Sequence, residues 1–310
     1  MTLDRIGQLL TELPGEAEVR ILRWADVTTL GVGLGKFHCI SPEMVSSLKK
    51  ILQFINNKQI NYIVIGNGSN LIGSDADCDG VVLDLRRCGS EIHHDGAVFT
   101  VGAAVSLLTL ARFSAERGYG GLSKLCGIPG QFGGVVTMNA GALGQEICTY
   151  VQELHGILAG HDWSWRPEPA DWGYRHCRLP SGVVLTSVVL KLKEVVPEEE
   201  NKLILSELRR RADVTPKGRS AGSVFRNPPG EFAGALLEQC GCKGLSVGNL
   251  HVSERHANWI VKEGEEPGHA SDCRLLVEEM RRRVQERFGV LLENEWHWVN
   301  LRQNLLHELH

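Results

Sequence analysis

The apolar residues of this chain recur with two spacings, and each spacing predicts a different kind of element. Apolar positions three and four residues apart predict a helix that begins at residues 41–43, with a serine N-cap and a proline in the first turn. The buried stripe of that helix is predicted to be Met44, Leu48, Ile51, Leu52 and Ile55. Further helices are predicted over residues 106–117, 202–213 and 271–288, with Gly118 and Gly289 ending the first and the last of these.

Short alternating or continuous apolar runs predict strands. These cover residues 62–65, 81–85, 150–158, 183–192 and 290–299. The last strand is predicted to have one apolar and one polar face, with Leu292, Trp296 and Trp298 opposite Glu293, Glu295 and His297.

Two stretches lack a regular pattern. Residues 118–144 are rich in glycine and are predicted to be irregular, and residues 195–200, with one proline and three glutamates, are predicted to form a surface connection. A chain of 310 residues is long for one core. The mixture of helices and strands on both sides of the connection predicts an α+β fold with two lobes.

Composition and charge narrow the classes of partner. The net charge of −4 is spread along the chain, so a nucleic-acid partner is not indicated. No obligate protein partner is evident from the sequence. No apolar stretch approaches the roughly 18–20 residues that span a bilayer, and residues 1–10 lack the features of a signal peptide, so we expect a cytoplasmic protein without a membrane partner. The nine cysteines are irregularly spaced and indicate neither a zinc site nor a disulfide framework, and no other metal site is evident.

A short glycine loop, Gly66-Asn67-Gly68-Ser69-Asn70, follows the predicted strand 62–65. Glycines let the backbone approach a ligand closely, and successive N–H groups in such a turn can form a nest for an anion. The loop lacks the third glycine and the following helix of a Rossmann fingerprint, and no Gly-Lys-Ser/Thr follows it as in a P-loop. As a pattern alone, a hairpin connection explains it as well as a phosphate cradle does.

A longer glycine-rich segment covers residues 127–144 and includes Gly127-Ile128-Pro129-Gly130, Gly133-Gly134 and Asn139-Ala140-Gly141. A structural loop crossing explains one or two of its six glycines, but not all of them. Extended glycine loops are often functional. We therefore favour ligand contact over a purely structural role for this segment.

Three further segments reveal no chemistry by themselves. They are Tyr174-Arg175, the run Ala221–Pro228 around Ser223, and the run Val252–Asn258 around His256. Ser223 lacks the Gly-x-Ser-x-Gly context of an acyl-transfer nucleophile, and a histidine such as His256 is more often structural than catalytic.

Taken together and in this order, these segments resemble the UDP-N-acetylenolpyruvoylglucosamine reductase (MurB) family. Three family motifs are matched in the first part of the chain: glycines ending in Ser-Asn at 66–70, Gly-Ile-Pro-Gly leading to Met-Asn-Ala-Gly-Ala at 127–142, and Tyr-Arg at 174–175. Three more are matched later: Gly-Ser-x-Phe-x-Asn-Pro at 222–228, Val-Ser-x-x-His-Ala-Asn at 252–258, and Phe-Gly-Val-x-Leu-Glu-x-Glu at 288–295. The resemblance therefore extends over nearly the whole chain.

Four positions depart from the family pattern. Leu34 interrupts a glycine pair, and Asn67, Leu143 and Cys177 stand where glycine, tyrosine and serine are usual. A long substrate loop found in one subgroup has no counterpart after residue 261, so the chain resembles the shorter (type II) subgroup.

The resemblance implies a two-lobed FAD-binding region of the vanillyl-alcohol-oxidase (PCMH) type, followed by an α/β substrate-binding domain. The first would cover residues 1–195, with lobes at about 1–85 and 86–195, and the second residues 205–310. FAD would be bound without a covalent link, and NADPH would be the co-substrate. The cofactor-binding residues carried over from the family are Gly66, Asn67, Gly68, Ser69, Asn70, Gly127, Ile128, Pro129, Gly133, Gly134, Asn139, Ala140 and Gly141.

The implied activity is the FAD-mediated reduction of UDP-N-acetyl-enolpyruvylglucosamine to UDP-N-acetylmuramate in peptidoglycan synthesis. The family's catalytic arginine, serine and glutamate map to Arg175, Ser223 and Glu295. The arginine would stabilise negative charge beside the substrate carboxylate, and the serine would protonate the neighbouring carbon. Candidate substrate-binding residues are Asn227, Ser253, His256 and Asn258.

Two other functions stay open from the sequence. A sugar or lactone oxidase on the same flavin fold would use the glycine loops but has no need for the motif at 222–228. A flavin-binding homologue without catalysis would not need the three mapped catalytic residues, all of which are present.

Overall fold

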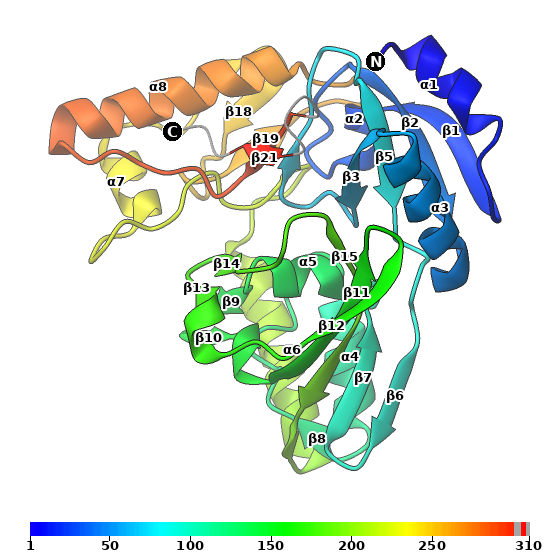
Figure 1. The fold of residues 1–310 in the computed structure, drawn as a ribbon. Helices are drawn as coiled ribbons and strands as arrows, with labels where there is room; N and C mark the ends of the chain where they lie inside the picture. Colours follow the sequence, from blue (N-terminus) through cyan, green and yellow to red (C-terminus); the bar gives the residue numbers. More distant parts are fainter. Residues whose placement is uncertain (301–304, 308–310) are drawn as a thin grey trace.

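The computed structural model of the protein describes residues 1–300 and 305–307, which fold in three parts (Figure 1). The first part, drawn in blue, is built around a four-stranded sheet in the order β1-β2-β5-β3, in which only β1 is antiparallel to its neighbour. Its elements are α1 (Leu3–Leu10), β1 (Ala17–Arg23), α2 (Trp24–Val27), β2 (Lys36–Pro42), α3 (Val45–Asn57), β3 (Asn61–Ile65), β4 (Leu71–Ile72) and β5 (Gly80–Asp84).

The helix expected from residues 41–43 begins later than predicted. Ser41 and Pro42 still pair with β1 as the end of β2, so α3 begins at Val45. Most of the predicted stripe is confirmed, because Leu48, Ile51, Leu52 and Ile55 are buried. Met44 lies outside the helix as its N-cap and is exposed.

The second part contains a five-stranded antiparallel sheet in the order β12-β11-β15-β7-β6, the lower body in Figure 1. Its strands are β6 (Ile92–Asp95), β7 (Val98–Gly102), β11 (Val151–Leu158), β12 (His161–Trp165) and β15 (Val183–Lys191). Helices α4 (Leu107–Ala115), α5 (Phe132–Thr137) and α6 (Pro197–Val214) bury Leu110, Val136 and Ile204 against the apolar side chains of the sheet.

Short two-residue strands and single 3₁₀ turns complete the second part. They are β8 (Tyr119–Gly120), β9 (Gly141–Ala142), β10 (Gln145–Glu146), β13 (Trp172–Gly173), β14 (His176–Cys177), β16 (Lys193–Glu194), and the turns Ile147–Thr149 and Pro169–Asp171.

The glycine-rich stretch 118–144 is less irregular than predicted. Helix α5 forms inside it, although glycine disfavours helix. The backbone N–H groups of Phe132 and Gly133 donate to the carbonyls of Val105 (2.8 Å) and Ala103 (2.9 Å), so tertiary contacts hold its first turn.

The stretch predicted as a surface connection is the first turn of α6. Pro197 occupies the start of the helix, where its missing N–H costs nothing, and the three following glutamates suit the positive end of the helix dipole. Glu200 is buried and accepts from the Gly121 backbone N–H at 2.9 Å. Residue 205, the predicted start of the second domain, therefore lies inside a helix that packs against the second part.

The third part, at the upper left of Figure 1, packs two helices on a small sheet. Its elements are α7 (Ala233–Gln239), β17 (Ser246–Val247), β18 (Leu250–Val252), β19 (Ile260–Lys262) and α8 (Ala270–Phe288). Helix α8 ends at Gly289, as predicted, with Gly289 in the left-handed region at φ +70°. Its N-cap is His269, so the helix begins at Ala270, one residue before the predicted start.

The final strand is shorter than predicted. Only β20 (His297–Asn300) finds partners, in β4 and in β21 (Leu305–His307), whereas residues 290–296 make one isolated bridge, between Asn294 and Phe225. The predicted apolar face is confirmed, because Leu292, Trp296 and Trp298 are all buried.

The first and third parts share one core. Leu30, Val32 and Ile72 of the first part pack in the same apolar cluster as the residues of α7 and α8. The Gly33 N–H donates to the Gly268 carbonyl, and the Gly268 N–H donates to the Gly31 carbonyl, each at 2.9 Å. The predicted α+β class is confirmed. Among residues 1–300 and 305–307, no helix combines the length and apolar character needed to cross a membrane.

Asp75 of the first part caps helix α8 of the third. Its carboxylate accepts from the backbone N–H groups of Ala270 (2.9 Å), Ser271 (3.0 Å) and Leu34 (3.2 Å). The first two are N–H groups that a helix cannot pair internally. Burial raises the pKa of Asp75, but these hydrogen bonds lower it by more, so the net pKa lies below its usual value.

We expect Asp75→Asn to lower the free energy of unfolding by about 1 kcal/mol, because the amide keeps one acceptor oxygen but loses the charge and the second acceptor. Urea unfolding measures it, with Asp79→Asn in the same turn as the matched control. Because the folded pKa is below the unfolded value, the wild-type contribution is complete above about pH 4 and is lost as the pH falls through the folded pKa. Equal losses in both variants would show that the cap contributes nothing specific.

Candidate functional site

The two glycine-rich loops lie against each other. The Ser69 hydroxyl donates to the Pro129 carbonyl at 3.4 Å, and a Cβ added to Gly66 would lie 2.6 Å from Oε1 of Gln131. The Gln131 amide also donates to the carbonyls of Arg86 and Ala104. Segments that are sixty residues apart in the chain therefore form one surface.

The first loop presents unused donors. Within residues 1–300 and 305–307, none of the backbone N–H groups of residues 66–70 donates a hydrogen bond to the protein. Gly68 has φ +62°, and a Cβ there would lie 2.3 Å from the Val27 carbonyl oxygen, so the turn requires glycine. Free N–H groups on a partly buried turn suit the pyrophosphate of the expected FAD.

The second loop leaves room beside its backbone. A Cβ added to exposed Gly134 would meet no atom within 4 Å, and one added to Gly130 would meet only the Ser69 hydroxyl, at 3.1 Å. Its other end is held from α6, where the Arg211 guanidinium donates to the Gly127 carbonyl at 2.8 Å. Both loops therefore fit a flat, phosphate-containing cofactor at their shared surface.

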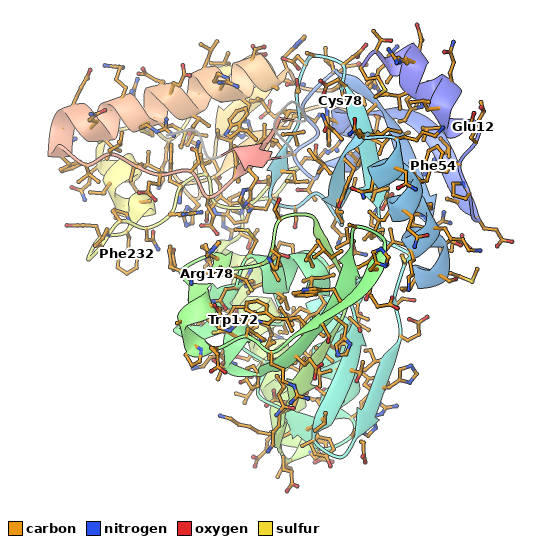
Figure 2. The ribbon with its side chains drawn as sticks, viewed as in Figure 1. Glu12, Phe54, Cys78, Trp172, Arg178 and Phe232 are labelled. Atoms are coloured by element: carbon orange, nitrogen blue, oxygen red, sulfur yellow. The ribbon has the colours of Figure 1, made fainter. Side chains whose placement is uncertain are left out.

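Arg175 lies at the tip of the hairpin formed by β13 and β14. The hairpin begins with Trp172, which packs against the core of the second part (Figure 2). Arg175 itself has φ +58°, a conformation that residues other than glycine adopt rarely. Its Nε donates to Oε1 of Glu295 at 2.9 Å, and its Nη1 donates to the Gly141 carbonyl at 3.1 Å.

Glu295 joins three segments of the site. Its carboxylate binds Arg175, its carbonyl accepts from Nδ2 of Asn70 at 3.0 Å, and its N–H donates to the Val224 carbonyl at 2.8 Å. Burial raises the pKa of Glu295 above its usual value, although Arg175 and Arg226 act in the opposite direction.

Ser223 comes immediately before the backbone that binds Glu295. It forms an isolated bridge with Trp259, and the next residue, Val224, donates to the Asn258 carbonyl at 2.9 Å. In the described part of the chain its hydroxyl makes no hydrogen bond and so remains available as a donor. The structure thus brings Arg175 and Glu295 into contact and places Ser223 in the segment that hydrogen-bonds to the Glu295 backbone.

Comparison with known proteins decides the family. The profile described as "UDP-N-acetylenolpyruvoylglucosamine reductase, C-terminal domain" matches residues 214–299, and that described as "FAD binding domain" matches residues 38–160. The chain is 35% identical to UDP-N-acetylenolpyruvoylglucosamine reductase of Desulforamulus reducens. The match extends over 262 residues and covers 83% of this chain and 85% of the relative. It is 39% identical over 271 residues to the Thermus thermophilus protein of the same name, which covers 87% and 95%.

The chain belongs to the UDP-N-acetylenolpyruvoylglucosamine reductase family. A crystal structure of the family's reductase from Thermus caldophilus agrees with this fold at a TM-score of 0.77 and 35% identity, covering 92% of this chain and 100% of that one. The family resemblance and the fold, an FAD-binding region followed by the reductase C-terminal domain, are therefore confirmed.

The four residues expected to bind substrate in this reductase family mostly make internal contacts. Buried Asn258 accepts from the Phe225 N–H and donates to the Phe225 carbonyl, so its amide fixes the backbone that follows Ser223. The Asn227 side chain accepts from the Ala233 N–H at the start of α7. Ser253 and His256 accept from N–H groups two residues further on, and burial lowers the pKa of His256. Their direct contact with substrate stays a prediction.

The sequence did not predict the charged residues that fix the glycine-rich stretch 118–144. In α6, Glu200 binds the Gly121 backbone and Arg211 binds the Gly127 backbone. Glu146 accepts from the side chain of Asn139 at 3.0 Å. A charged residue facing a glycine segment from a distant helix gives no signal in one sequence. Glu146 could have been singled out from the sequence, since it is a carboxylate two residues after the glycine-rich segment.

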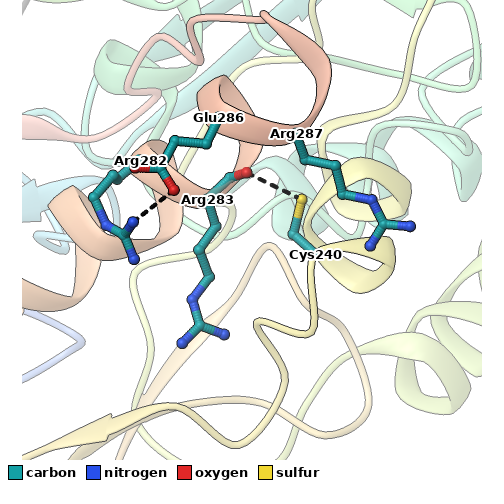
Figure 3. A pocket seen from close by; sticks show the side chains of 5 residues that line it. All are labelled: Cys240, Arg282, Arg283, Glu286 and Arg287. Carbon is teal, nitrogen blue, oxygen red and sulfur yellow. Dashed lines mark hydrogen bonds and ion pairs between the residues drawn. The ribbon is translucent and has the colours of Figure 1, made fainter.

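A cavity of about 470 Å³ lies away from this site, between α7 and the end of α8 (Figure 3). It is lined by Cys240, Arg282, Arg283, Glu286 and Arg287. Glu279 and Glu286 neutralise Arg282, and Glu279 also binds Arg283, so the cavity does not concentrate unpaired positive charge. Burial raises the pKa of the Cys240 thiol, which makes it a poor nucleophile.

Proposed function

We propose that this chain catalyses the NADPH-dependent reduction of UDP-N-acetyl-enolpyruvylglucosamine to UDP-N-acetylmuramate, a step of peptidoglycan synthesis. The observation that carries the proposal is the contact between Arg175 and Glu295, whose backbone is hydrogen-bonded to the segment that follows Ser223 and to the first glycine loop. An arginine fork, a buried carboxyl group and a free hydroxyl are the groups that reduction of an enolpyruvyl ether requires.

FAD would lie along the two glycine loops, with its pyrophosphate at residues 66–70 and its isoalloxazine beside residues 127–134. When bound, it accepts hydride from NADPH and supplies hydride to the vinyl carbon of the substrate. The free N–H groups of the first loop and the open space beside Gly134 support this placement. The residues assigned to the cofactor from the family motif remain part of this proposal, except the side chain of Asn139, whose amide is bonded inside the protein.

Arg175 would bind the enolpyruvyl carboxylate. Its Nε and Nη1 are occupied by Glu295 and Gly141, and within the described chain Nη2 makes no hydrogen bond, so this nitrogen is free for the substrate. The guanidinium charge would stabilise the negative charge that builds up beside the carboxylate as hydride adds. Glu295 would orient the guanidinium and assist proton delivery.

Ser223 would protonate the carbon next to the carboxylate. A hydroxyl is a weak acid in water, so this role requires a strongly basic carbon and a site without bulk solvent. Ser223 is only partly exposed, and its segment is fixed by hydrogen bonds to Asn258 and Glu295.

The third part would bind the UDP-sugar, with contributions from Asn227, Ser253, His256 and Asn258. We keep the division into residues 1–195 and 205–310, in which α6 crosses the boundary, and the assignment to the shorter subgroup. The small-molecule substrate is the partner on which the function depends. We propose a cytoplasmic protein that acts without nucleic acid, a membrane or an obligate protein partner.

One assay separates this function from its rivals. NADPH oxidation should be slow with oxygen alone and should accelerate when the enolpyruvyl substrate is added, with one product formed for each NADPH. Oxygen consumption driven by a sugar or lactone, without NADPH, would identify an oxidase instead. A protein that binds FAD but turns over neither substrate would be a non-catalytic homologue.

The purified protein should be yellow, and acid or heat should release intact FAD into the supernatant. His38 and Cys126, the side-chain types that attach flavin covalently in this fold, are both buried; His38 contacts the Leu3 carbonyl and Cys126 the Ile204 carbonyl. Absorbance of the supernatant after precipitation is the measurement. Flavin that remains with the precipitate would contradict non-covalent binding.

A further inference from the structure

Asn139 is the most completely enclosed polar side chain near Arg175. The residue has no exposed surface, and its backbone is in the left-handed region at φ +39°. Its Nδ2 donates to Oε2 of Glu146 and to the Gly173 carbonyl, each at 3.0 Å. Its Oδ1 accepts from the Cys148 N–H at 3.2 Å. Both amide hydrogens and the oxygen are therefore used inside the protein, so the side chain is not free to bind a cofactor.

The bond to Gly173 reaches the hairpin that carries Arg175. Gly173 is the last residue of β13 before the two-residue turn Tyr174-Arg175, and its strand partner is His176. The Arg175 backbone is in the left-handed region, where any residue other than glycine is strained by about 1–3 kcal/mol. Such a conformation persists only when the surrounding structure holds it from several sides.

Three contacts hold the turn. Arg175 binds Glu295 and the Gly141 carbonyl through its own guanidinium, and Asn139 holds the backbone immediately before the turn. The first two contacts are made by the guanidinium that would also bind the substrate carboxylate. The hydrogen bond from Asn139 to Gly173 does not involve the guanidinium, so it can hold the hairpin both before and after the substrate binds.

We propose that Asn139, supported by Glu146, is a positioning residue that holds the Arg175 hairpin, rather than a ligand of the flavin. The inference rests on the proposed function, since it assigns Arg175 to the substrate. Glu146 keeps the amide oriented, because its carboxylate takes one of the two Nδ2 hydrogens and directs the other to Gly173. Loss of Asn139 should therefore impair the step that uses Arg175 and spare the binding and reduction of flavin.

The most informative variant is Asn139→Asp. It keeps the size of the side chain and the acceptor for Cys148, but removes both donated hydrogen bonds and adds a carboxylate beside Glu146. We expect reoxidation of the reduced flavin by the enolpyruvyl substrate to slow by about 10-fold to 10²-fold, the usual cost of a misplaced catalytic group. The dissociation constant for FAD and the rate of flavin reduction by NADPH should change by less than about threefold.

A double variant tests whether the effect passes through Arg175. In an Arg175→Ala background, Asn139→Asp should slow reoxidation by no more than about twofold, because the charged group that it positions is already gone. Independent, multiplying effects would overturn the inference. Gln145→Ala is the matched control: Gln145 lies in the same hairpin as Glu146 but binds the Gly121 carbonyl and the Tyr150 hydroxyl, and its loss should leave reoxidation unchanged.

Glu146→Ala keeps the test decisive if the Asn139 variants fail to fold. It removes a half-buried carboxylate that accepts from Asn139 and, more weakly, from the Cys148 thiol, and reoxidation should slow by about threefold to tenfold without weaker FAD binding. A raised dissociation constant for FAD, or equal slowing of both half-reactions, would make Asn139 a cofactor residue. A wild-type enzyme that is not reoxidised by the enolpyruvyl ether would instead overturn the proposed function.

Discussion

Ser223→Ala is expected to slow the reoxidation of reduced flavin by substrate by about 10²-fold to 10⁴-fold, the range of general acid contributions. Reduction of the flavin by NADPH should stay within about twofold of wild type, because no proton is added to carbon in that step. The hydroxyl is free of hydrogen bonds within the described residues, and the backbone on its C-terminal side is fixed to Asn258 and Glu295. Stopped-flow measurement of the two half-reactions separates these effects.

Two variants sharpen the test of Ser223. Ser223→Cys should retain more activity than Ser223→Ala, because a thiol can still donate a proton. Ser220→Ala removes a hydroxyl three residues away, which accepts only from the Gly222 N–H within the described residues, and should change reoxidation by less than about threefold. Equal slowing of both half-reactions in Ser223→Ala would make Ser223 a residue for folding or flavin positioning instead of an acid.

The spacing of apolar residues correctly predicted the elements that bury one apolar face. The stripe of α3 without Met44, the end of α8 at Gly289 and the buried face of Leu292, Trp296 and Trp298 are all present. Burial of one apolar face decides the first and the third, and the left-handed backbone of Gly289 decides the second, and both signals are local in the sequence.

The elements that periodicity missed depend on distant partners. Residues 41–42 stay in a strand because β1 pairs with them, α5 forms because Val105 and Ala103 accept its first N–H groups, and the last strand extends only where β4 and β21 pair with it. The start of α6 was different, because Pro197 and the glutamates after it are a local signal for a helix N-terminus.

The site itself could be predicted only in part. The motifs identified Arg175, Ser223 and Glu295 as candidates, but a single sequence cannot show that Arg175 and Glu295 touch across a separation of 120 positions. Sequence reasoning also treated residues 139–141 as one cofactor-binding motif. The structure separates their contacts, since the Asn139 side chain faces Glu146 and Gly173 while the Gly141 carbonyl binds Arg175.

Glu293 and Glu295 lie two residues apart, and either could supply the catalytic carboxylate. The structure places the two side chains in different surroundings. The Glu295 side chain is 18% exposed and binds Arg175 at 2.9 Å, whereas the Glu293 side chain is 72% exposed and lies 3.8 Å from Arg226. A carboxylate that is largely in water contributes little through such a contact. One that is buried against the guanidinium controls both its position and its charge.

Glu295→Gln should therefore slow substrate-driven reoxidation of the flavin by at least about tenfold, and Glu293→Gln by less than about twofold. Glutamine keeps the length of the side chain but cannot neutralise Arg175 or exchange a proton, so the loss reports on charge and not on shape. The rate of flavin reduction by NADPH serves as the internal control in both variants. The reverse pattern, with Glu293→Gln the slower enzyme, would move the role by two residues and would contradict the contact between Glu295 and Arg175 as the basis of the site.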